Sequence, residues 1–322
     1  MSRLAFIGRR LGFSILAAYA VMTVSFFVVA VMPDPNVGLA AWTAKGDPDE
    51  AANAVVEAKN LNDPLLDRYL QWVVDLTTFD WGRSIGGFGR PGEPVIELLQ
   101  SVIPVTLAYL VPALLISTTL ALALGSYVAL NPESRVATSI SSVGYLGLGV
   151  PSFFVAELLL FAANEQFDWL TVAFPRRIDL VDPVSLWPYL IPATVLATGL
   201  AAGQLRYVRA ESSELLGRDF VKLVESKGAG DLRVIRHVLA NAALPLLSLF
   251  FADMVSTMVV QVFVIEFVFG LQGIGTLTLQ AVSDRNMPVI IGTTMAIAYA
   301  GIGANFLQDV AYAWFDPRAD FE

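Results

Sequence analysis

The 322-residue chain is 56% hydrophobic and only 15% charged. A soluble domain of this size carries about 25% charged residues, so the composition excludes an ordinary soluble protein. The chain has no cysteine and one histidine, His237, which excludes disulfides, thiolate metal sites and a histidine cluster for zinc. Apolar runs of about twenty residues recur, enough to cross about 30 Å of hydrocarbon. The sequence therefore predicts an all-α membrane protein.

Acidic residues outnumber basic ones, with 29 Asp and Glu against 20 Lys and Arg and a formal net charge of −9. Only four of the bases are lysines. A hydrated acidic surface keeps proteins soluble at high salt, so one explanation is an origin in a halophilic archaeon. A simply acidic extracellular face explains the same excess, and the two explanations stay open.

Six apolar segments are long enough to span a membrane. They cover about residues 11–32, 103–130, 137–163, 187–207, 242–263 and 289–314. We expect the second segment to begin with a kinked turn near Pro104 and Pro112, because proline lacks the backbone donor that a helix interior needs. The predicted fold class is therefore an all-α protein with six transmembrane helices.

Basic residues near the ends of these segments fall on one face of the arrangement. They are Arg3, Arg9, Arg10, Arg135, the seven bases between residues 206 and 236, and Arg318. Cytoplasmic loops are enriched in Lys and Arg, so this face is assigned to the cytoplasm. Both termini are then cytoplasmic, which agrees with an even number of spans.

The chain divides into three parts. Residues 1–32 hold the N-terminal tail and the first span, and residues 33–97 form a polar segment with eleven acids and five bases. This segment is too polar for lipid and residues 61–78 have helical spacing, so we expect an extracytoplasmic cap of short helices. Residues 98–322 hold the core spans and a polar cytoplasmic loop, 208–240.

The loop 208–240 is rich in helix-forming residues. We expect a helix over 211–226 that stops at Gly228 and Gly230, because glycine accepts the left-handed conformation that ends helices. A second helix is expected to begin near Asp231, as its N-cap, and to run into the membrane near Pro245. Charge alone is also explained by an ordinary polar loop between two spans.

Several sequence blocks resemble one family. D-F-V-K-L-V-E-S-K-G (219–228), then R-H (236–237) and N-A-A-L-P (241–245), resemble the cytoplasmic coupling loop of ABC-transporter permease subunits. Further blocks resemble the dipeptide/oligopeptide (peptide/nickel) importer family within that class. They are M-P-D-P (32–35), N-D-P-L-L-D-R-Y-L-Q-W (62–72), F-D-W-G-R-S (79–84), V-I-E-F-V-F-G-L-Q-G-I-G (264–275), D-R-N-M-P-V (284–289) and D-P-R (316–318). The glycine of the family's P-G-D-P turn is missing here.

The resemblance implies a type I ABC importer permease that forms half of a translocation path for di- and oligopeptides. It implies a second homologous permease subunit, two cytoplasmic ATPase subunits that bind ATP and Mg, and an extracytoplasmic solute-binding protein. The other expected partners are the peptide substrate and membrane lipid, with no nucleic acid. This chain itself is expected to hold no cofactor and to be non-catalytic.

The resemblance also implies which loop residues meet the ATPase. They are Asp219, Phe220, Lys222, Val224, Lys227, Gly228, Ala229, Asp231, Arg236, His237 and Pro245. ATP-driven closure of the ATPase pair is expected to push this loop and to tilt the membrane helices.

Acids within membrane spans are costly and indicate function. The candidates for the path or its gate are Glu157, Gln204, Asp253, Gln261, Glu266, Phe269, Gly273, Gly275 and Asp309, with Asn305 as a further polar residue. A carboxylate facing the path would meet the amino terminus of a peptide. Hydrogen bonding between helices explains the polar residues equally, and a simple hairpin cap explains the glycines of 264–275.

Two other functions are consistent with parts of the sequence. A proton-coupled secondary transporter would use the intramembrane acids as proton relays, but it gives the long polar loop no role. An intramembrane protease needs a serine with a base or two facing aspartates. The one histidine lies in the cytoplasmic loop, and neither Asp253 nor Asp309 has a G-x-G-D context. No P-loop sequence occurs, so the chain is not expected to bind ATP by that motif.

Overall fold

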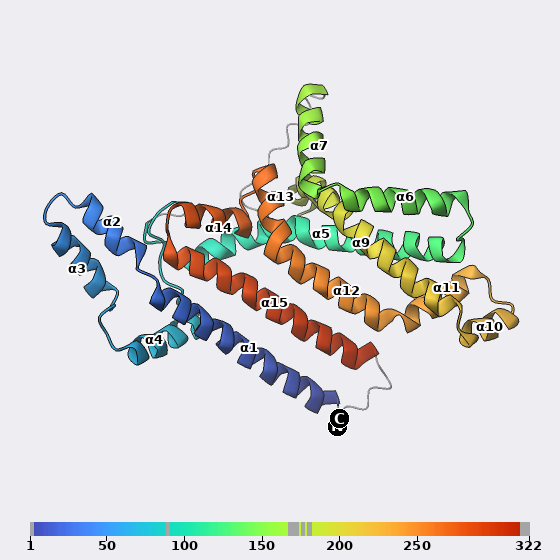
Figure 1. Ribbon diagram of the computed structural model, residues 1–322, viewed down its shortest axis with the longest axis horizontal. Coiled ribbons are helices and arrows are strands. Elements are labelled where there is room, and N and C mark those ends of the chain that lie inside the picture. Colours follow the sequence, from blue (N-terminus) through green and yellow to red (C-terminus); the bar gives the residue numbers. More distant parts are fainter. Residues whose placement is uncertain (1–2, 88–90, 167–173, 175–177, 179–181, 316–322) are drawn as a thin grey trace. The chain divides into compact units, whose positions relative to one another are not determined.

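The computed structural model describes residues 3–87, 91–166, 174, 178 and 182–315 (Figure 1). Within these ranges the regular secondary structure is helical, apart from an isolated antiparallel bridge between Arg83 and Pro94. It forms two compact units, one of residues 1–7, 102–276 and 304–322, and the other of residues 8–101 and 277–303. We call them unit 1 and unit 2. The D-P-R block and Arg318 lie outside the described residues.

Five helical segments of the described chain are long and apolar enough to cross a membrane. They are α1 (Arg3–Val31), α5 (Val95–Leu130), the segment that ends in α9 (Leu190–Leu216), the segment α12 (Ala243–Ser256) to α13 (Val262–Phe269), and α15 (Met287–Phe315). The segment before α9 consists of α8 (Pro183–Leu186) and η2 (Trp187–Tyr189). Between α12 and α13 the chain makes a π-helical turn, η3 (Thr257–Gln261).

The predicted third span, 137–163, is not one straight helix. It consists of α6 (Arg135–Gly149) and α7 (Ser152–Gln166), which meet at an angle of 94° (Figure 1). Pro151 explains the break, because a residue before proline is driven from the helical to the extended region, and Val150 has φ −104° and ψ 114°. The described chain therefore has five spans, or six if this bent pair crosses as one.

Two helices extend beyond the spans expected from the sequence. α5 begins at Val95 and continues through Pro104 and Pro112, so no helix start lies near these prolines. α9 continues past residue 207 to Leu216, which carries the helix into the polar loop. The hydrophobic span thus marks only part of each helix, because helix-forming polar residues extend it beyond the apolar stretch.

Unit 1 is held together by a core of large side chains from several helices. Tyr109 of α5, Tyr189 of η2, Leu196 of α9 and Ile265 of α13 are fully or almost fully buried in one cluster. Residues of α7 also pack against it, so that the second half of the bent pair is anchored to the core. This core fixes the helices that carry the candidate site.

Unit 2 contains three short helices, α2 (Pro35–Thr43), α3 (Pro48–Ala58) and α4 (Leu65–Thr77), so the short helices expected after the first span are present. The carboxyl groups of Asp34 and Asp47 accept backbone hydrogen bonds at the starts of α2 and α3, as N-caps do. α4 packs on α1, where Trp72 Nε1 donates to the carbonyl of Met22 at 3.0 Å. Phe26 packs edge-on against Trp72.

Candidate functional site

The polar loop 208–240 folds into a compact foot of two helices, α10 (Asp219–Ser226) and α11 (Asp231–Asn241). Val221 of α10 is buried against Val234, Ile235 and Val238 of α11. Gly228 lies between the helices with φ +74°, the left-handed conformation expected of it. An apolar core of this kind makes the foot a rigid body instead of a flexible loop.

Two details of the foot differ from the sequence prediction. The helix expected over 211–226 is interrupted at Gly217 and Arg218, so that it consists of the end of α9 and the whole of α10. The N-cap of α11 is Gly230, and Asp231 is the first helical residue. An acid in the first turn still stabilises the helix, because it faces the positive end of the helix dipole.

The predicted docking residues divide into two sets. The exposed set presents charge and backbone to solvent: Asp219, Lys222, Lys227, Gly228, Asp231, Arg236 and His237. The half-buried set packs inward: Phe220, Val224, Ala229 and Pro245. Lys222 pairs with Asp219 at 3.0 Å on the surface of α10.

Two exposed apolar residues of the foot are not among the docking residues predicted from the sequence. The side chains of Leu223 and Leu232 are 58% and 85% exposed, one on α10 and one on α11. Their exposure could have been predicted from helical spacing, because both lie outside the apolar face that Val221, Val234 and Val238 form. The foot therefore presents two leucines on its surface besides its charged residues.

A second candidate lies in unit 1 around Glu266, which is 0% exposed. Its Oε1 accepts hydrogen bonds from the hydroxyls of Thr106 (2.6 Å) and Tyr109 (3.0 Å) of α5. Its Oε2 accepts one from the backbone N–H of Thr276 at 2.9 Å, and the backbone of Gly275 donates another. Glu266 thus holds the first turn of α14 (Ile274–Ser283), whose N–H groups have no partner within the helix.

The glycines of the same block fit around this carboxyl group. Gly270 ends α13 in the left-handed conformation, with φ +64°. A Cβ at Gly273 would collide with the Glu266 carboxyl group and lie 2.5 Å from Thr106 Oγ1. The structure therefore brings Glu266, Gly273 and Gly275 together as a closed, hydrogen-bonded turn. Phe269 is buried in the neighbouring core, where its ring contacts that of Phe174 edge-on.

A third candidate is a polar pair between two spans of unit 1. Gln204 Nε2 on α9 donates to Asp253 Oδ2 on α12 at 2.7 Å. A cavity of about 470 Å³ adjoins this pair and is lined by residues of α6, α9 and α12. The sequence predicted Gln204 and Asp253 as separate path candidates, and the structure shows that they form a hydrogen bond.

The remaining predicted residues lie apart from these sets. Glu157 is exposed on α7. Gln261 Oε1 accepts from Ser152 Oγ at 3.3 Å, which links η3 to α7. Asp309 is half-buried on α15 and Asn305 is exposed there. Within residues 3–87, 91–166 and 182–315, no group of three His, Cys, Asp or Glu is arranged to hold a metal ion.

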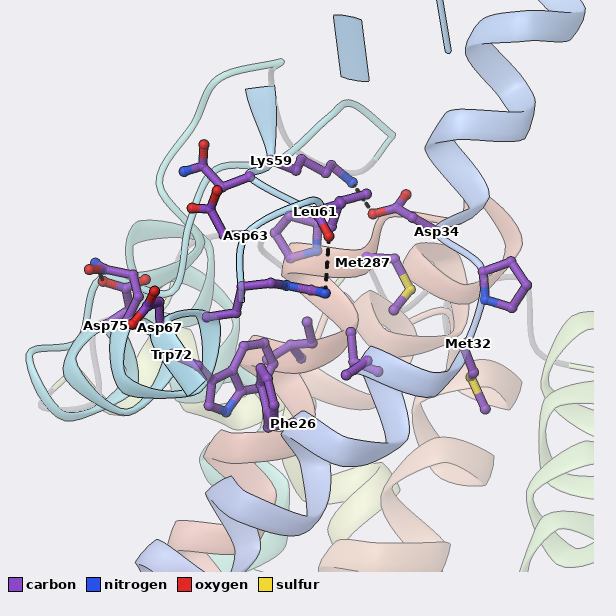
Figure 2. Close-up of a pocket in the computed structure, with 18 residues that line it drawn as sticks. Phe26, Met32, Asp34, Lys59, Leu61, Asp63, Asp67, Trp72, Asp75 and Met287 are labelled. Atoms are coloured by element: carbon purple, nitrogen blue, oxygen red, sulfur yellow. Dashed lines mark hydrogen bonds and ion pairs between the residues drawn. The ribbon is translucent and has the colours of Figure 1, made fainter. Parts of the chain in front are cut away.

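Unit 2 holds a larger cavity, of about 940 Å³, at the end of α1 (Figure 2). Phe26 and Trp72 form an aromatic side, and Asp63, Asp67 and Asp75 supply carboxyl groups. Its two bases both have partners: Lys59 pairs with Asp34 at 2.6 Å, and Arg68 Nη1 donates to the carbonyl of Leu61 at 3.3 Å.

Burial raises the pKa of Asp75 in this cavity, a hydrogen bond from Gln71 opposes the shift, and the charge of Asp80 adds to it. Residues of the block 62–72 line this cavity, which the sequence did not predict.

The family of binding-protein-dependent transport system inner membrane components matches residues 121–321, which include the foot, the Glu266 turn and the Gln204–Asp253 pair. The chain belongs to this family. It is 27% identical to the oligopeptide transport system permease protein AppB of Bacillus subtilis, over 98% of this chain and 99% of that one. It is 29% identical to the dipeptide transport system permease protein DppB of the same organism, over 92% of each chain. A Brucella suis protein named as a peptide permease is 33% identical over 80% of this chain and 81% of its own.

Membership in the family of binding-protein-dependent permeases confirms the resemblance that the sequence blocks indicated. The chain is a multi-pass membrane protein and a permease component of an ABC transporter. The helices of the described residues, with five spans or six, fit a type I permease. The rival prediction of a proton-coupled carrier gains no support from this membership.

Proposed function

We propose that the chain is one permease subunit of an ATP-driven importer of di- and oligopeptides and forms half of its translocation path. The observation that carries the proposal is similarity along nearly the whole chain to permeases named for oligopeptide and dipeptide transport. The rigid foot of α10 and α11 supports it, because an ATP-driven permease needs a cytoplasmic lever and a secondary carrier does not.

The assembly follows from the resemblance. A second homologous permease completes the path, and two cytoplasmic ATPase subunits bind ATP and Mg, so this chain needs no cofactor and catalyses no reaction. The basic residues between 206 and 236 favour a cytoplasmic foot and cytoplasmic termini. Residues 33–97 then form an extracytoplasmic cap between the first span (1–32) and the core (98–322), and the solute-binding protein docks on that side.

The foot is the mechanical element of the proposal. Its exposed residues, from Asp219 to His237, sit in a groove of an ATPase subunit, and Val221 and Val234 keep the two helices from bending apart. Closure of the ATPase pair then moves α10 and α11 together and pulls on α9 and α12, which lie on either side of the foot in sequence. The path opens alternately to the two faces of the membrane.

Reconstitution of the chain with its partner permease, ATPases and binding protein in liposomes tests the proposal. Uptake of a labelled dipeptide or tripeptide is expected only with ATP inside the compartment that contains the ATPases, and loaded binding protein is expected to stimulate ATP hydrolysis. Uptake by the chain alone, driven by a pH gradient without ATP, would overturn the proposal in favour of the proton-coupled carrier.

A further inference from the structure

The cavity beside Gln204 and Asp253 has the size and position of a ligand site. Its volume of about 470 Å³ lies in the range of roughly 300–1,000 Å³ typical of small-molecule sites. Gly199 and Gly203 leave space on the α9 side, and Leu249 of α12 supplies an apolar wall. Both helices that carry the polar pair belong to the predicted core spans.

The polar pair at this cavity is incompletely satisfied. Gln204 is only 3% exposed, and its amide NH₂ group donates to Asp253. Its amide oxygen, Oε1, is buried and has no hydrogen-bond partner. Buried polar atoms in native proteins almost always have a partner, so this oxygen calls for a donor that binds beside it.

Two oxygen atoms at the pair, Gln204 Oε1 and the second carboxylate oxygen of Asp253, can accept further hydrogen bonds. Asp253 uses one carboxylate oxygen for Gln204, and among the described residues it forms no ion pair. A half-buried carboxylate needs a positive charge nearby to offset its loss of water. The group that fits a carboxylate oxygen and an amide oxygen together is a cation with several N–H donors, and an ammonium group has three.

A second charged residue at the cavity narrows the class of ligand that fits it. Arg206 lines the same space and is exposed, and a guanidinium group there suits a carboxylate. A ligand with an ammonium group at one end and a carboxylate at the other matches both charges. A short peptide has this character.

We propose that the Gln204–Asp253 pair binds the N-terminal ammonium group of the transported peptide, with Asp253 as its charge partner and Gln204 Oε1 as a second acceptor. This proposal rests on the proposed function, because it places the site on the peptide's path. In this proposal the permease itself, and not only the binding protein, recognises the free amino terminus of the peptide.

The test uses the complete transporter in liposomes with the variants Asp253→Asn and Gln204→Leu and the control Glu133→Gln, an exposed acid between α5 and α6 of the same unit. Asp253→Asn keeps an acceptor for Gln204 and removes the charge. We expect it to lower ATP-dependent uptake of a free-amine tripeptide roughly tenfold, about the effect of one charge-assisted hydrogen bond. Gln204→Leu is expected to act in the same direction, and Glu133→Gln to leave uptake unchanged.

Three further readouts separate this proposal from other causes. Stimulation of ATP hydrolysis by loaded binding protein should persist in Asp253→Asn, because the foot and the docking face are intact. A tripeptide with a photoreactive side chain should label α9 or α12 in the wild type, and the free-amine tripeptide should compete while its N-acetylated form should not. Asp253→Asn should lose this labelling.

Wild-type uptake in Asp253→Asn, or labelling that the N-acetylated peptide blocks equally, would overturn the proposal. Loss of the second permease from the purified Asp253→Asn complex would also overturn it, because Asp253 would then serve the subunit interface. A wild-type complex without ATP-dependent uptake is a different result and contradicts the proposed function itself.

Discussion

The hydroxyl of Thr106 on α5 lies 2.6 Å from Oε1 of Glu266 on α13, a residue that follows it by 160 positions. Thr106 also accepts a hydrogen bond from the backbone N–H of Ile274 at 3.0 Å. The two side chains together therefore satisfy the start of α14 and tie it to α5 and α13. An acid near the end of the segment from α12 to α13 thus caps the next helix of the chain, α14.

Replacing Glu266 by glutamine is expected to destabilise the protein. Both carboxyl oxygens accept hydrogen bonds, and glutamine replaces one acceptor by an NH₂ group that meets another donor. The loss is roughly 1–3 kcal/mol, the typical effect of an unsatisfied buried group. A lower thermal-unfolding temperature of the purified complex checks this.

Glu157→Gln is the matched control, because Glu157 is exposed on α7 of the same unit. It should unfold at the wild-type temperature. If the two variants have the same stability, Glu266 does not hold α14 in the way the hydrogen bonds indicate.

Changing Gly228 to alanine is expected to impair coupling to the ATPases. At φ +74° an alanine costs roughly 1–2 kcal/mol, because its Cβ approaches the following carbonyl oxygen. The turn between α10 and α11 should shift, so that loaded binding protein stimulates ATP hydrolysis less. Steady-state ATPase assays on the reconstituted complex measure the change.

Gly230→Ala is the control for backbone conformation, since Gly230 has φ −79° and no atom lies within 4 Å of an added Cβ. It is two residues away in the same foot. Equal ATPase stimulation in the two variants would show that the left-handed turn is not needed for coupling.

Asn286 joins two family blocks of unit 2 that are distant in sequence. Its Nδ2 donates to Ser84 Oγ at 2.9 Å and to the carbonyl of Gly86 at 2.8 Å, and the residue is buried. Asn286→Ala leaves these acceptors without their donor and is expected to cost roughly 1–3 kcal/mol of stability. Thermal unfolding of the purified complex detects the loss.

Asn62→Ala is the control, because Asn62 is exposed between α3 and α4 of the same unit. We expect it to leave the unfolding temperature unchanged. A stable Asn286→Ala variant would mean that the bridge contributes nothing to unit 2.

The sequence could predict what depends on local pattern. Apolar length located five spans and the bent pair, because a span must cross the hydrocarbon whatever its partners are. Gly228 predicted the turn between the two helices of the foot, because glycine takes the left-handed conformation without strain. The break at Val150 could also be predicted from the sequence, because Pro151 disfavours the helical conformation of the residue before it.

Contacts between distant positions could not be predicted in the same way. Nothing near Glu266 in sequence points to Thr106 or Tyr109, and nothing near Asn286 points to Ser84. Both pairings depend on how whole helices pack, which a single sequence does not record. The halophilic origin, the orientation of the termini, the division into 1–32, 33–97 and 98–322, and the roles of the path residues stay predictions.

Substitution of Leu232 tests whether the foot docks on the ATPase subunit through an apolar contact. Its side chain is 85% exposed, so Leu232→Gln removes no packing within the chain and should leave its stability unchanged. Docking leucines are desolvated in the complex, and each lost contact weakens association by about 1–3 kcal/mol. We therefore expect less ATPase subunit to co-purify with Leu232→Gln and with Leu223→Gln. Leu66→Gln, on α4 and 65% exposed, is the matched control and should retain full co-purification. If all three variants retain the ATPases equally, the foot binds through its charged residues and backbone, and the exposed leucines have another role.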